Sequence, residues 1–179
     1  HDFVPESLRQ DAYEDHPLPI GEGQTISQPY IVAAMLEHLA LQPTDRVLEV
    51  GTGSGYVTAL LAVLCAEVFS VERHASLAKS AEAALIRLGY RNVTIKLGDG
   101  SLGWAEHAPF DAILVSAAAS EVPAALFEQL SPEGRMVIPV GSAMMQELML
   151  IRKRNSERDV QVLEGCRFVP LIAKVGGSF

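Results

Sequence analysis

A short apolar run that breaks into alternating glycines constrains the fold of this chain more than any other feature. Residues 47–50 (Val-Leu-Glu-Val) have the pattern of a buried parallel strand. Gly51, Gly53 and Gly55 follow, and a helical pattern begins at Tyr56. Glycine suits such a turn because the backbone must bend sharply and approach a ligand closely, where a Cβ atom would clash. A strand, a glycine turn and a helix in this order predict the first half of a nucleotide-binding βαβ unit.

The spacing of these glycines argues against a dinucleotide ligand. The dinucleotide fingerprint is G-x-G-x-x-G, with the pyrophosphate on the N-terminus of the helix. In this chain the third glycine comes one residue early, and Glu49 precedes the first glycine. This variant favours a cofactor without phosphates, for which S-adenosylmethionine is the leading candidate. A nicotinamide-dependent dehydrogenase is correspondingly disfavoured.

The rest of the chain alternates between strand and helix patterns. We expect strands at 46–50, 67–72, 92–97, 110–116, 135–140, 147–153 and 160–169, and helices at 28–41, 55–64, 75–88 and 122–130. No helix separates the last two strands, which a charged loop at 154–159 joins, so we expect that pair to be antiparallel. The alternation predicts the α/β class, with a doubly wound, mostly parallel seven-stranded sheet of Rossmann-like type and a C-terminal antiparallel strand pair.

The chain is expected to form a single domain over residues 1–179, with 28–179 as the cofactor-binding α/β core. Residues 1–27 are rich in proline, glycine and polar residues and show little periodicity. We therefore expect an irregular N-terminal cap and substrate loop there, with a short helix near 5–12. Ser27 has the residue type of an N-cap for the helix at 28–41, and Pro29 suits its first turn.

Composition argues against several classes of partner. The net charge is −8, from 14 Lys+Arg against 22 Asp+Glu, whereas a nucleic-acid-binding protein needs a basic surface. No apolar run reaches the ~18 residues of a membrane span, and the first residues carry no signal-peptide pattern. The histidines share no metal-ligand spacing, and Cys65 and Cys166 lie far apart. We expect no metal, nucleic-acid or membrane partner, and a cytoplasmic monomer with reduced core thiols.

Acidic residues follow successive predicted strands at the edge where the glycine turn lies. Glu72 can accept both ribose hydroxyls of an adenosine group, as an acidic residue does in dinucleotide sites. The carboxylate of Asp99, or the backbone near it, can meet the adenine amino group. With Glu49, these acids suit a cationic sulfonium ligand, and the small residues at 116–119 leave room for it. The alternative is that Glu72 and Asp99 are ordinary surface residues at strand ends.

The run at 18–29 (Leu-Pro-Ile-Gly-Glu-Gly-Gln-Thr-Ile-Ser-Gln-Pro) resembles the hallmark P-I-G-x-G-Q-T-I-S-Q-P segment of the protein-L-isoaspartate (D-aspartate) O-methyltransferase family. The resemblance continues in order through 49–56, 70–73, 98–102, 109–118, 121–123, 138–141 and 167–171. It implies the fold of a class I S-adenosylmethionine-dependent methyltransferase. It also implies protein repair, by methyl transfer from S-adenosyl-L-methionine to the α-carboxylate of L-isoaspartyl or D-aspartyl residues in damaged proteins and peptides.

The resemblance also implies roles for individual residues. Ser27 falls at the family's active-site serine, although as a plain helix N-cap it would need no such role. Together with the strand-end reasoning, it gives these expected cofactor-binding residues: Thr25, Ile26, Ser27, Glu49, Gly51, Thr52, Gly53, Gly55, Glu72, Arg73, Asp99 and Gly100. The expected substrate-binding residues are Leu18, Pro19, Ile20, Val169, Pro170 and Leu171.

This chemistry demands little of the protein's acids and bases. The attacking carboxylate has a reference pKa of ~3.9, so it is already ionised at neutral pH and needs no general base. The leaving sulfide is neutral and needs no general acid. Catalysis then rests on aligning oxygen, methyl carbon and sulfur, and such positioning is worth ~7–11 kcal/mol. A neutral hydroxyl such as that of Ser27 holds the carboxylate without stabilising its ground state as a lysine would.

Two other functions remain open from the sequence. One is an O-methyltransferase that esterifies ordinary aspartate in a specific peptide. The other is a non-catalytic S-adenosylmethionine-binding module, which would be expected to lose Ser27, Glu72 or the glycines, whereas this chain keeps them all.

Overall fold

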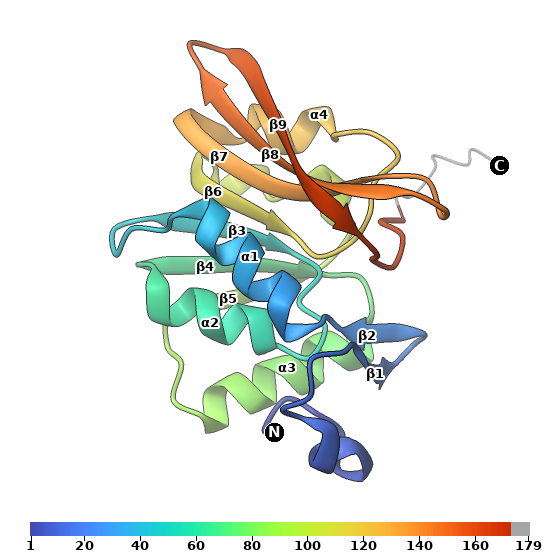
Figure 1. The fold of residues 1–179 in the computed structure, drawn as a ribbon. Helices are drawn as coiled ribbons and strands as arrows, with labels where there is room; N and C mark the ends of the chain where they lie inside the picture. Colours follow the sequence, from blue (N-terminus) through green and yellow to red (C-terminus); the bar gives the residue numbers. More distant parts are fainter. Residues whose placement is uncertain (173–179) are drawn as a thin grey trace, which may run out of the picture.

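The computed structural model describes residues 1–172 and is built on a seven-stranded sheet in the order β5-β4-β3-β6-β7-β8-β9 (Figure 1). The strands are β3 (Arg46–Val50), β4 (Glu67–Glu72), β5 (Val93–Leu97), β6 (Phe110–Val115), β7 (Leu130–Gly141), β8 (Gln146–Arg154) and β9 (Glu157–Cys166). Strands β5, β4, β3, β6 and β7 run parallel, and β8 is antiparallel to both β7 and β9. The predicted mostly parallel sheet with a C-terminal antiparallel pair is confirmed.

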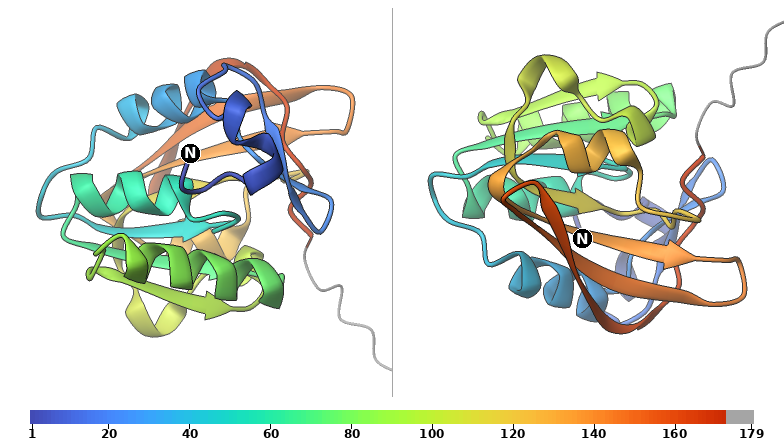
Figure 2. Two further views of the ribbon diagram at one scale, coloured as in Figure 1. Left: turned by 90° about the horizontal axis from the view of Figure 1, so that it is seen from below. Right: turned by 90° about the horizontal axis from the view of Figure 1, so that it is seen from above.

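Helices cover both faces of this sheet. They are α1 (Pro29–Leu39), α2 (Tyr56–Leu64), α3 (Ala75–Arg87) and α4 (Ala124–Glu128), with short 3₁₀ helices at η1 (Glu6–Asp11), η2 (Gly100–Leu102) and η3 (Ala105–His107). The two views of Figure 2 look from opposite sides, with α2 and α3 in front in one and α4 in front in the other. The sheet is therefore a buried layer between two helical layers, which suits its almost continuous apolar strands.

The alternation of side chains along β3 shows how the strands serve two cores. Val47 faces the cluster formed with α1 and α2, whereas Leu48 and Val50 face the cluster that includes Leu126 of α4. All of these side chains are almost completely buried. Glu49 lies between Leu48 and Val50, so it projects to the same side as Val47, beneath α2. The direction of Glu49 decides its role, as described below.

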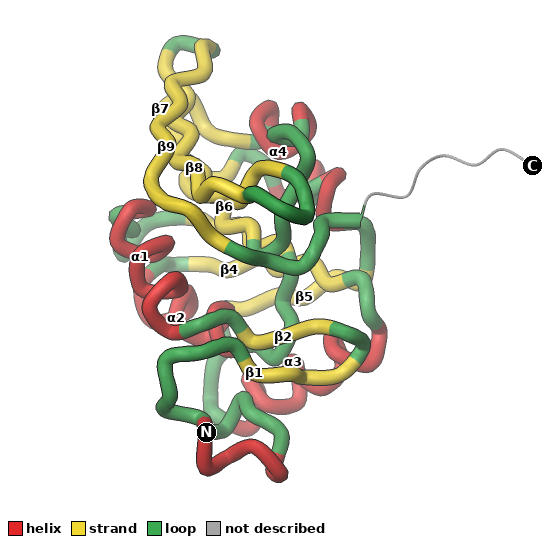
Figure 3. Tube along the Cα trace, turned by 45° about the vertical axis from the view of Figure 1, so that its right-hand side comes forward, coloured by secondary structure: helices red, strands yellow, loops and turns green. Residues whose placement is uncertain are grey.

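The segment at 18–26 forms a β-hairpin, whereas the expectation was an irregular loop. Strands β1 (Leu18–Gly21) and β2 (Gln24–Ile26) pair antiparallel, and Figure 3 shows them apart from the main sheet. Glu22 and Gly23 both have positive φ, at 52° and 68°, the geometry of a tight two-residue hairpin turn. The strands are short and carry proline and glycine, so no period-2 pattern is visible. The expected short helix near 5–12 is present as η1.

Two boundaries near the C-terminal strands also differ from the prediction. The charged loop expected at 154–159 is a two-residue turn at Asn155 and Ser156, with φ of 49° and 70°, so β8 and β9 extend almost to it. The strand expected to begin at 135 begins at Leu130 instead, and its register with β6 shifts between Leu130 and Arg135. Charged and turn-forming residues are therefore found within and beside these strands, because exposed strand positions tolerate them.

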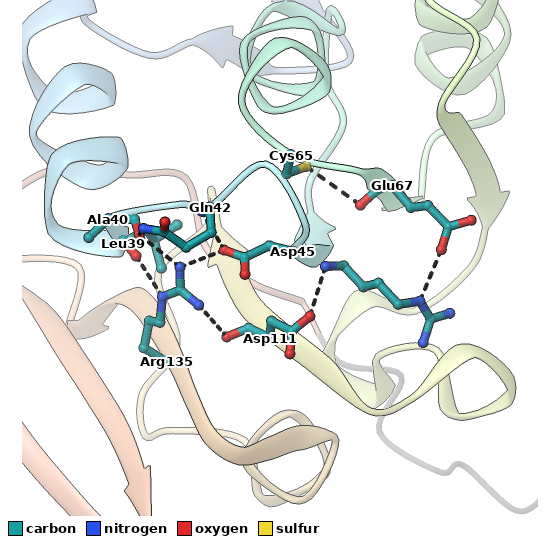
Figure 4. A network of polar contacts seen from close by, with 9 residues as sticks. Leu39, Ala40, Gln42, Asp45, Cys65, Glu67, Asp111 and Arg135 are labelled. Atoms are coloured by element: carbon teal, nitrogen blue, oxygen red, sulfur yellow. Dashed lines mark hydrogen bonds and ion pairs between the residues drawn. The ribbon is translucent and has the colours of Figure 1, made fainter.

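A polar network lies at the amino ends of the central strands (Figure 4). The guanidinium of Arg135 donates to the carbonyl oxygens of Leu39, Ala40 and Asp111 and to Oδ2 of Asp45, at 2.6–3.0 Å. Ala40 ends α1 in the left-handed conformation, with φ of 46°, which leaves its carbonyl for this arginine. The network ties α1, β6 and β7 together at the edge opposite the glycine turn.

Candidate functional site

A cavity opens at the carboxyl ends of β3, β4 and β6, where the chain connections diverge to either side of β3. This is the switch point at which open α/β sheets bind ligands. The empty space here, open solvent included, is about 750 Å³. Its walls are Gln24, Thr25, Ile26, Ser27, Val50, Gly51, Thr52, Gly53, Ser54, Tyr56, Val57, Val71, Glu72, Arg73, His74, Gly100, Ser116, Ala117, Val169, Pro170, Leu171 and Ile172.

The glycine turn forms the floor of this cavity. Gly51 and Gly53 have φ of 95° and 54°, which favours glycine over residues with a Cβ atom. A Cβ atom at Gly53 would lie 3.3 Å from the side chain of Ile20, beneath the β1–β2 hairpin. Gly55 also has positive φ, but it packs against Ala81 of α3 and is not part of the cavity wall. Glycine at this position lets α2 approach α3 closely, and the expected contact of Gly55 with a cofactor stays a prediction.

Glu72 is held rigidly at the cavity wall. Its side chain is buried, and its Oε2 accepts a hydrogen bond from the backbone N–H of Gly53 at 2.9 Å. Its Oε1 accepts from the backbone N–H of His74 at 2.9 Å. Each carboxylate oxygen has a second lone pair, so both can still accept a hydroxyl proton from a ligand. Glu72 is thus not an ordinary surface residue at a strand end.

Glu49 does not reach the cavity. Its carboxyl is fully buried, and its Oε2 accepts hydrogen bonds from Ser70 at 2.5 Å and Thr58 at 2.6 Å. Burial raises the pKa of Glu49 to about 8, against the opposing effect of these hydroxyls. The expected direct contact between Glu49 and a cationic cofactor is therefore corrected, since the group is mostly protonated at neutral pH. Glu49 instead supports Thr52, which lines the cavity and hydrogen-bonds Ser70 at 2.6 Å.

The wall beyond β5 comes from the backbone of Gly100 and not from the side chain of Asp99. Oδ1 of Asp99 accepts from the backbone N–H and the hydroxyl of Ser101, at 2.9 and 2.7 Å, and so caps η2. A Cβ atom at Gly100 would collide with Val50, which explains the glycine. The backbone of Gly100 reaches the cavity, and the expected adenine contact of Asp99, through its carboxylate or the nearby backbone, stays a prediction.

Ser27 lies between β2 and α1, and its hydroxyl makes no hydrogen bond to another described residue. The N-cap position of α1 is Gln28, which makes no side-chain cap. Asp15 supplies that cap instead, since its Oδ1 accepts from the N–H of Tyr30 at 2.9 Å and its Oδ2 accepts from the side chain of Gln28 at 3.0 Å. The interpretation of Ser27 as a helix cap is wrong, and its hydroxyl remains available to a ligand.

Ser27 also borders a second groove beside the cavity. Its lining residues are Pro17, Thr25, Ser27, Gln28, Tyr30, Ile31, Ser116, Glu164, Gly165, Cys166, Arg167, Phe168 and Val169. Four of these residues belong to both walls, namely Thr25, Ser27, Ser116 and Val169. The groove is wide, at about 960 Å³ including open solvent, and reaches the cavity at the serine. This arrangement suits a small cofactor in the cavity and a larger molecule in the groove.

The predicted substrate residues separate into two sets. Val169, Pro170 and Leu171 line the cavity, held by hydrogen bonds between Ala118 and the backbone of Val169 and Leu171 at 2.8 and 2.7 Å. Leu18, Pro19 and Ile20 line neither the cavity nor the groove. They belong to the first strand of the hairpin that carries Thr25 and Ile26 to the cavity, and their expected substrate contacts stay a prediction.

Sequence reasoning missed His74 as a site residue. His74 lines the cavity, and its Nε2 is buried without a hydrogen-bond partner among the described residues. Its Nδ1 lies 3.8 Å from Glu22 at the tip of the β1–β2 hairpin, and Ser76 donates to the same carboxylate at 2.6 Å. The position of His74 directly after β4 and Glu72 was the available signal. Gln24, Ser54, Val57 and Ile172 carried no comparable signal.

No helix within residues 1–172 is long and apolar enough to cross a membrane. The range also holds no group of three or more histidine, cysteine, aspartate or glutamate residues placed to ligate a metal ion.

Comparisons with known proteins agree on one family. A family model described as Protein-L-isoaspartate(D-aspartate) O-methyltransferase (PCMT) matches residues 1–176. A protein-L-isoaspartate O-methyltransferase of Koribacter versatilis (strain Ellin345) is 56% identical over 177 residues, which cover 99% of this chain and 80% of that protein. One of Syntrophus aciditrophicus (strain SB) is 54% identical over 181 residues, covering 99% of this chain and 83% of that protein.

Solved structures give the same result. A protein-L-isoaspartate O-methyltransferase structure superposes with a TM-score of 0.89 at 31% identity, covering 98% of this chain and 58% of that one. A Plasmodium falciparum structure described as a putative protein-L-isoaspartate O-methyltransferase, in complex with S-adenosyl-L-homocysteine, superposes with a TM-score of 0.84 at 30% identity. It is covered over 84% of its length, and this chain over 96%.

Proposed function

Because the chain belongs to the protein-L-isoaspartate (D-aspartate) O-methyltransferase family, we propose that it is a protein repair enzyme. It transfers a methyl group from S-adenosyl-L-methionine to the α-carboxylate of L-isoaspartyl or D-aspartyl residues in damaged proteins and peptides. The observation that carries this proposal is the unengaged hydroxyl of Ser27 at the junction of the cavity and the groove. A methyl donor in the cavity and a polypeptide in the groove would meet there.

The cavity residues fit S-adenosyl-L-methionine. The backbone of Gly51 and Gly53 admits close approach, and Glu72 presents carboxylate oxygens that can take the two ribose hydroxyls. The unpartnered Nε2 of His74 is a buried polar atom that a polar ligand would satisfy. Thr25, Ile26, Thr52, Arg73 and Gly100 complete the proposed cofactor wall. When bound, this cofactor supplies a methyl group on a positively charged sulfur.

Ser27 orients the substrate in this proposal. Its hydroxyl donates to the substrate carboxylate, which is ionised at neutral pH and needs no base. A hydroxyl donor holds the carboxylate but does not neutralise it, so the reacting oxygen keeps its nucleophilicity. The apolar side chains of Val169 and Leu171 keep water from the reacting atoms, which strengthens the attraction between carboxylate and cation. Ser27 is the proposed catalytic residue, acting by alignment.

A pair of peptides that differ only in one linkage tests the proposal. The purified chain should transfer labelled methyl from S-adenosyl-L-methionine to an isoaspartyl peptide but not to its aspartyl twin. Equal labelling of the two peptides would instead indicate an aspartyl O-methyltransferase. Cofactor binding without labelling of either peptide would indicate a non-catalytic binding module.

The proposal extends to a cytoplasmic monomer that does not bind nucleic acid. The net charge of −8 supports the absence of a nucleic-acid partner. Cys65 and Cys166 are free thiols, and burial raises their pKa to about 12 and about 11, so both remain protonated and unreactive at neutral pH. Sedimentation at assay concentration would contradict this part if it gave a dimer.

A further inference from the structure

The hairpin between β7 and β8 exposes two adjacent methionines beside the substrate groove. Met144 is 98% exposed and Met145 is 73% exposed. Side chains so apolar are rarely left in water in a pair at the tip of a hairpin, and exposed apolar patches commonly mark interaction sites. We refer to residues 142–145 as the methionine hairpin. Figures 1 and 2 show it projecting beside the segment that follows β9.

Hydrogen bonds within the turn fix the conformation of the methionine hairpin. The hydroxyl of Ser142 accepts hydrogen bonds from the backbone N–H of Met144 and Met145, both at 3.3 Å, and the N–H of Ser142 donates to the carbonyl of Met145 at 2.9 Å. At its base, Gly141 has φ of 146°, and a Cβ atom there would collide with the carbonyl of Met145. The turn therefore holds both methionines outward at a fixed place.

The same base is tied to the segment that lines the groove. The buried side chain of Gln146 donates to the carbonyl of Phe168 at 3.1 Å and accepts from the N–H of Phe168 at 2.6 Å. A hollow lined by Ala143, Met144, Gln146, Cys166 and Arg167 lies between the two segments. It shares Cys166 and Arg167 with the groove, which in turn shares Ser27 with the cavity. The hollow beside Met144 thus adjoins the groove at Cys166 and Arg167, and the groove adjoins the cavity at Ser27.

We propose that the methionine hairpin is a docking surface for an apolar side chain of the polypeptide that carries the isoaspartyl residue. This inference rests on the proposed function and deepens it. The occupant is an unfolded segment of the substrate. The groove that adjoins the hollow borders Ser27, where the reacting carboxylate would lie. Methionine is flexible and polarizable, so it packs against side chains of different shape. Such adaptability suits an enzyme whose substrates share one damaged linkage but no common sequence.

The test uses isoaspartyl peptides with a glycine and serine background and one leucine placed at successive positions on either side of the isoaspartyl residue. In the unmodified chain, leucine at one or two of these positions should lower KM on the order of threefold to tenfold, with kcat unchanged. The Met144→Ser/Met145→Ser double variant should lose this gain, and Met144→Leu/Met145→Leu should keep it. The leucine-free peptide should give the same KM with every variant, which also reports correct folding.

Val63→Ser is the matched control, because Val63 is an apolar side chain of α2 that is 71% exposed and lines neither the groove nor the hollow. It should leave the leucine effect unchanged. The docking proposal is overturned if no leucine position lowers KM, or if the double serine variant keeps the gain. It is also overturned if the methionines instead join two copies of the chain, seen as a dimer that the serine variant converts to a monomer. If no isoaspartyl peptide is methylated at all, the proposed function fails and this inference fails with it.

Discussion

The two ends of the same sheet differ in whether their polar groups are hydrogen-bonded within the protein. At the amino ends, all three guanidinium nitrogens of Arg135 donate to protein acceptors, namely three carbonyl oxygens and the carboxylate of Asp45. At the carboxyl ends, the hydroxyl of Ser27 has no partner among residues 1–172, Nε2 of His74 has none either, and Glu72 keeps spare lone pairs. The contrast shows that satisfied polar groups hold the scaffold, whereas unsatisfied ones at a cavity provide binding capacity.

The largest effect is expected at the amino ends. Arg135→Ala would remove the ion-pair partner of the buried carboxylate of Asp45 and one donor to each of three carbonyl oxygens, so the free energy of unfolding should fall by about 3–5 kcal/mol. Denaturant unfolding measures this loss. Arg154→Ala is the control, since Arg154 forms an exposed ion pair with Asp159 and should cost less than ~1 kcal/mol. Cofactor affinity of the folded Arg135→Ala protein should be unchanged. A large loss of affinity would contradict the assignment of a scaffold role to the amino ends and a binding role to the carboxyl ends.

A second effect concerns the buried acid between the two ends. Glu49 has a folded-state pKa of about 8, raised by burial from 4.5. Between these values the unfolded chain releases the proton while the folded chain keeps it, so stability falls as pH rises through this window. The loss should amount to a few kcal/mol in total. Glu49→Gln should flatten the stability profile between pH 5 and pH 8, and coincident profiles for the two proteins would show that Glu49 is ionised when folded.

A smaller effect is expected from Glu72 at the carboxyl ends. Glu72→Ala removes the proposed acceptor of the ribose hydroxyls and the anchor of the N–H groups of Gly53 and His74. Cofactor binding should weaken by about 1–3 kcal/mol, as measured by calorimetry. Glu82→Ala, at an exposed position of α3, should bind the cofactor normally. Unchanged binding in Glu72→Ala would exclude Glu72 from the ribose contact.

The smallest change in stability is expected at Ser27, paired with Asp15. Because Asp15 caps α1, Asp15→Ala should lower the free energy of unfolding by ~1 kcal/mol. Ser27→Ala should change it by no more than ~0.5 kcal/mol, since the hydroxyl holds no described residue. The same variant should lower kcat far more than cofactor affinity. Equal losses of stability in Asp15→Ala and Ser27→Ala would indicate that Ser27 also caps α1.

Prediction from sequence succeeded where the local pattern carried the physical reason. The run at 47–55 predicted the strand, the turn and the start of the helix. A strand buried on both faces requires a run of apolar residues, and positive φ favours glycine, so both features are visible in the sequence. It failed for β1 and β2, whose pairing depends on a tight turn between strands too short for a period. It also failed for Ser27 as a cap, because Asp15 is distant in sequence and only the folded chain brings it to α1.

The candidate site divides in the same way. Glu72 and Glu49 both come from strand patterns that end near the glycine turn, yet one reaches the cavity and the other lies beneath α2. Their sequence contexts are alike. Helix α2, packed over Glu49, shields its carboxyl from water, so the ionisation of Glu49 was beyond the reach of sequence reasoning.

By itself, the amino-acid sequence determined the order of strands and helices, the glycine turn and the membership of the family, because these depend on residue types at short spacing. Tertiary structure alone decided which polar groups remain unsatisfied at the cavity, that Asp15 rather than Ser27 caps α1, and that the hollow beside the methionine hairpin adjoins the groove. Those outcomes depend on contacts between segments far apart in the chain, and only the packing of the sheet and its helices creates them.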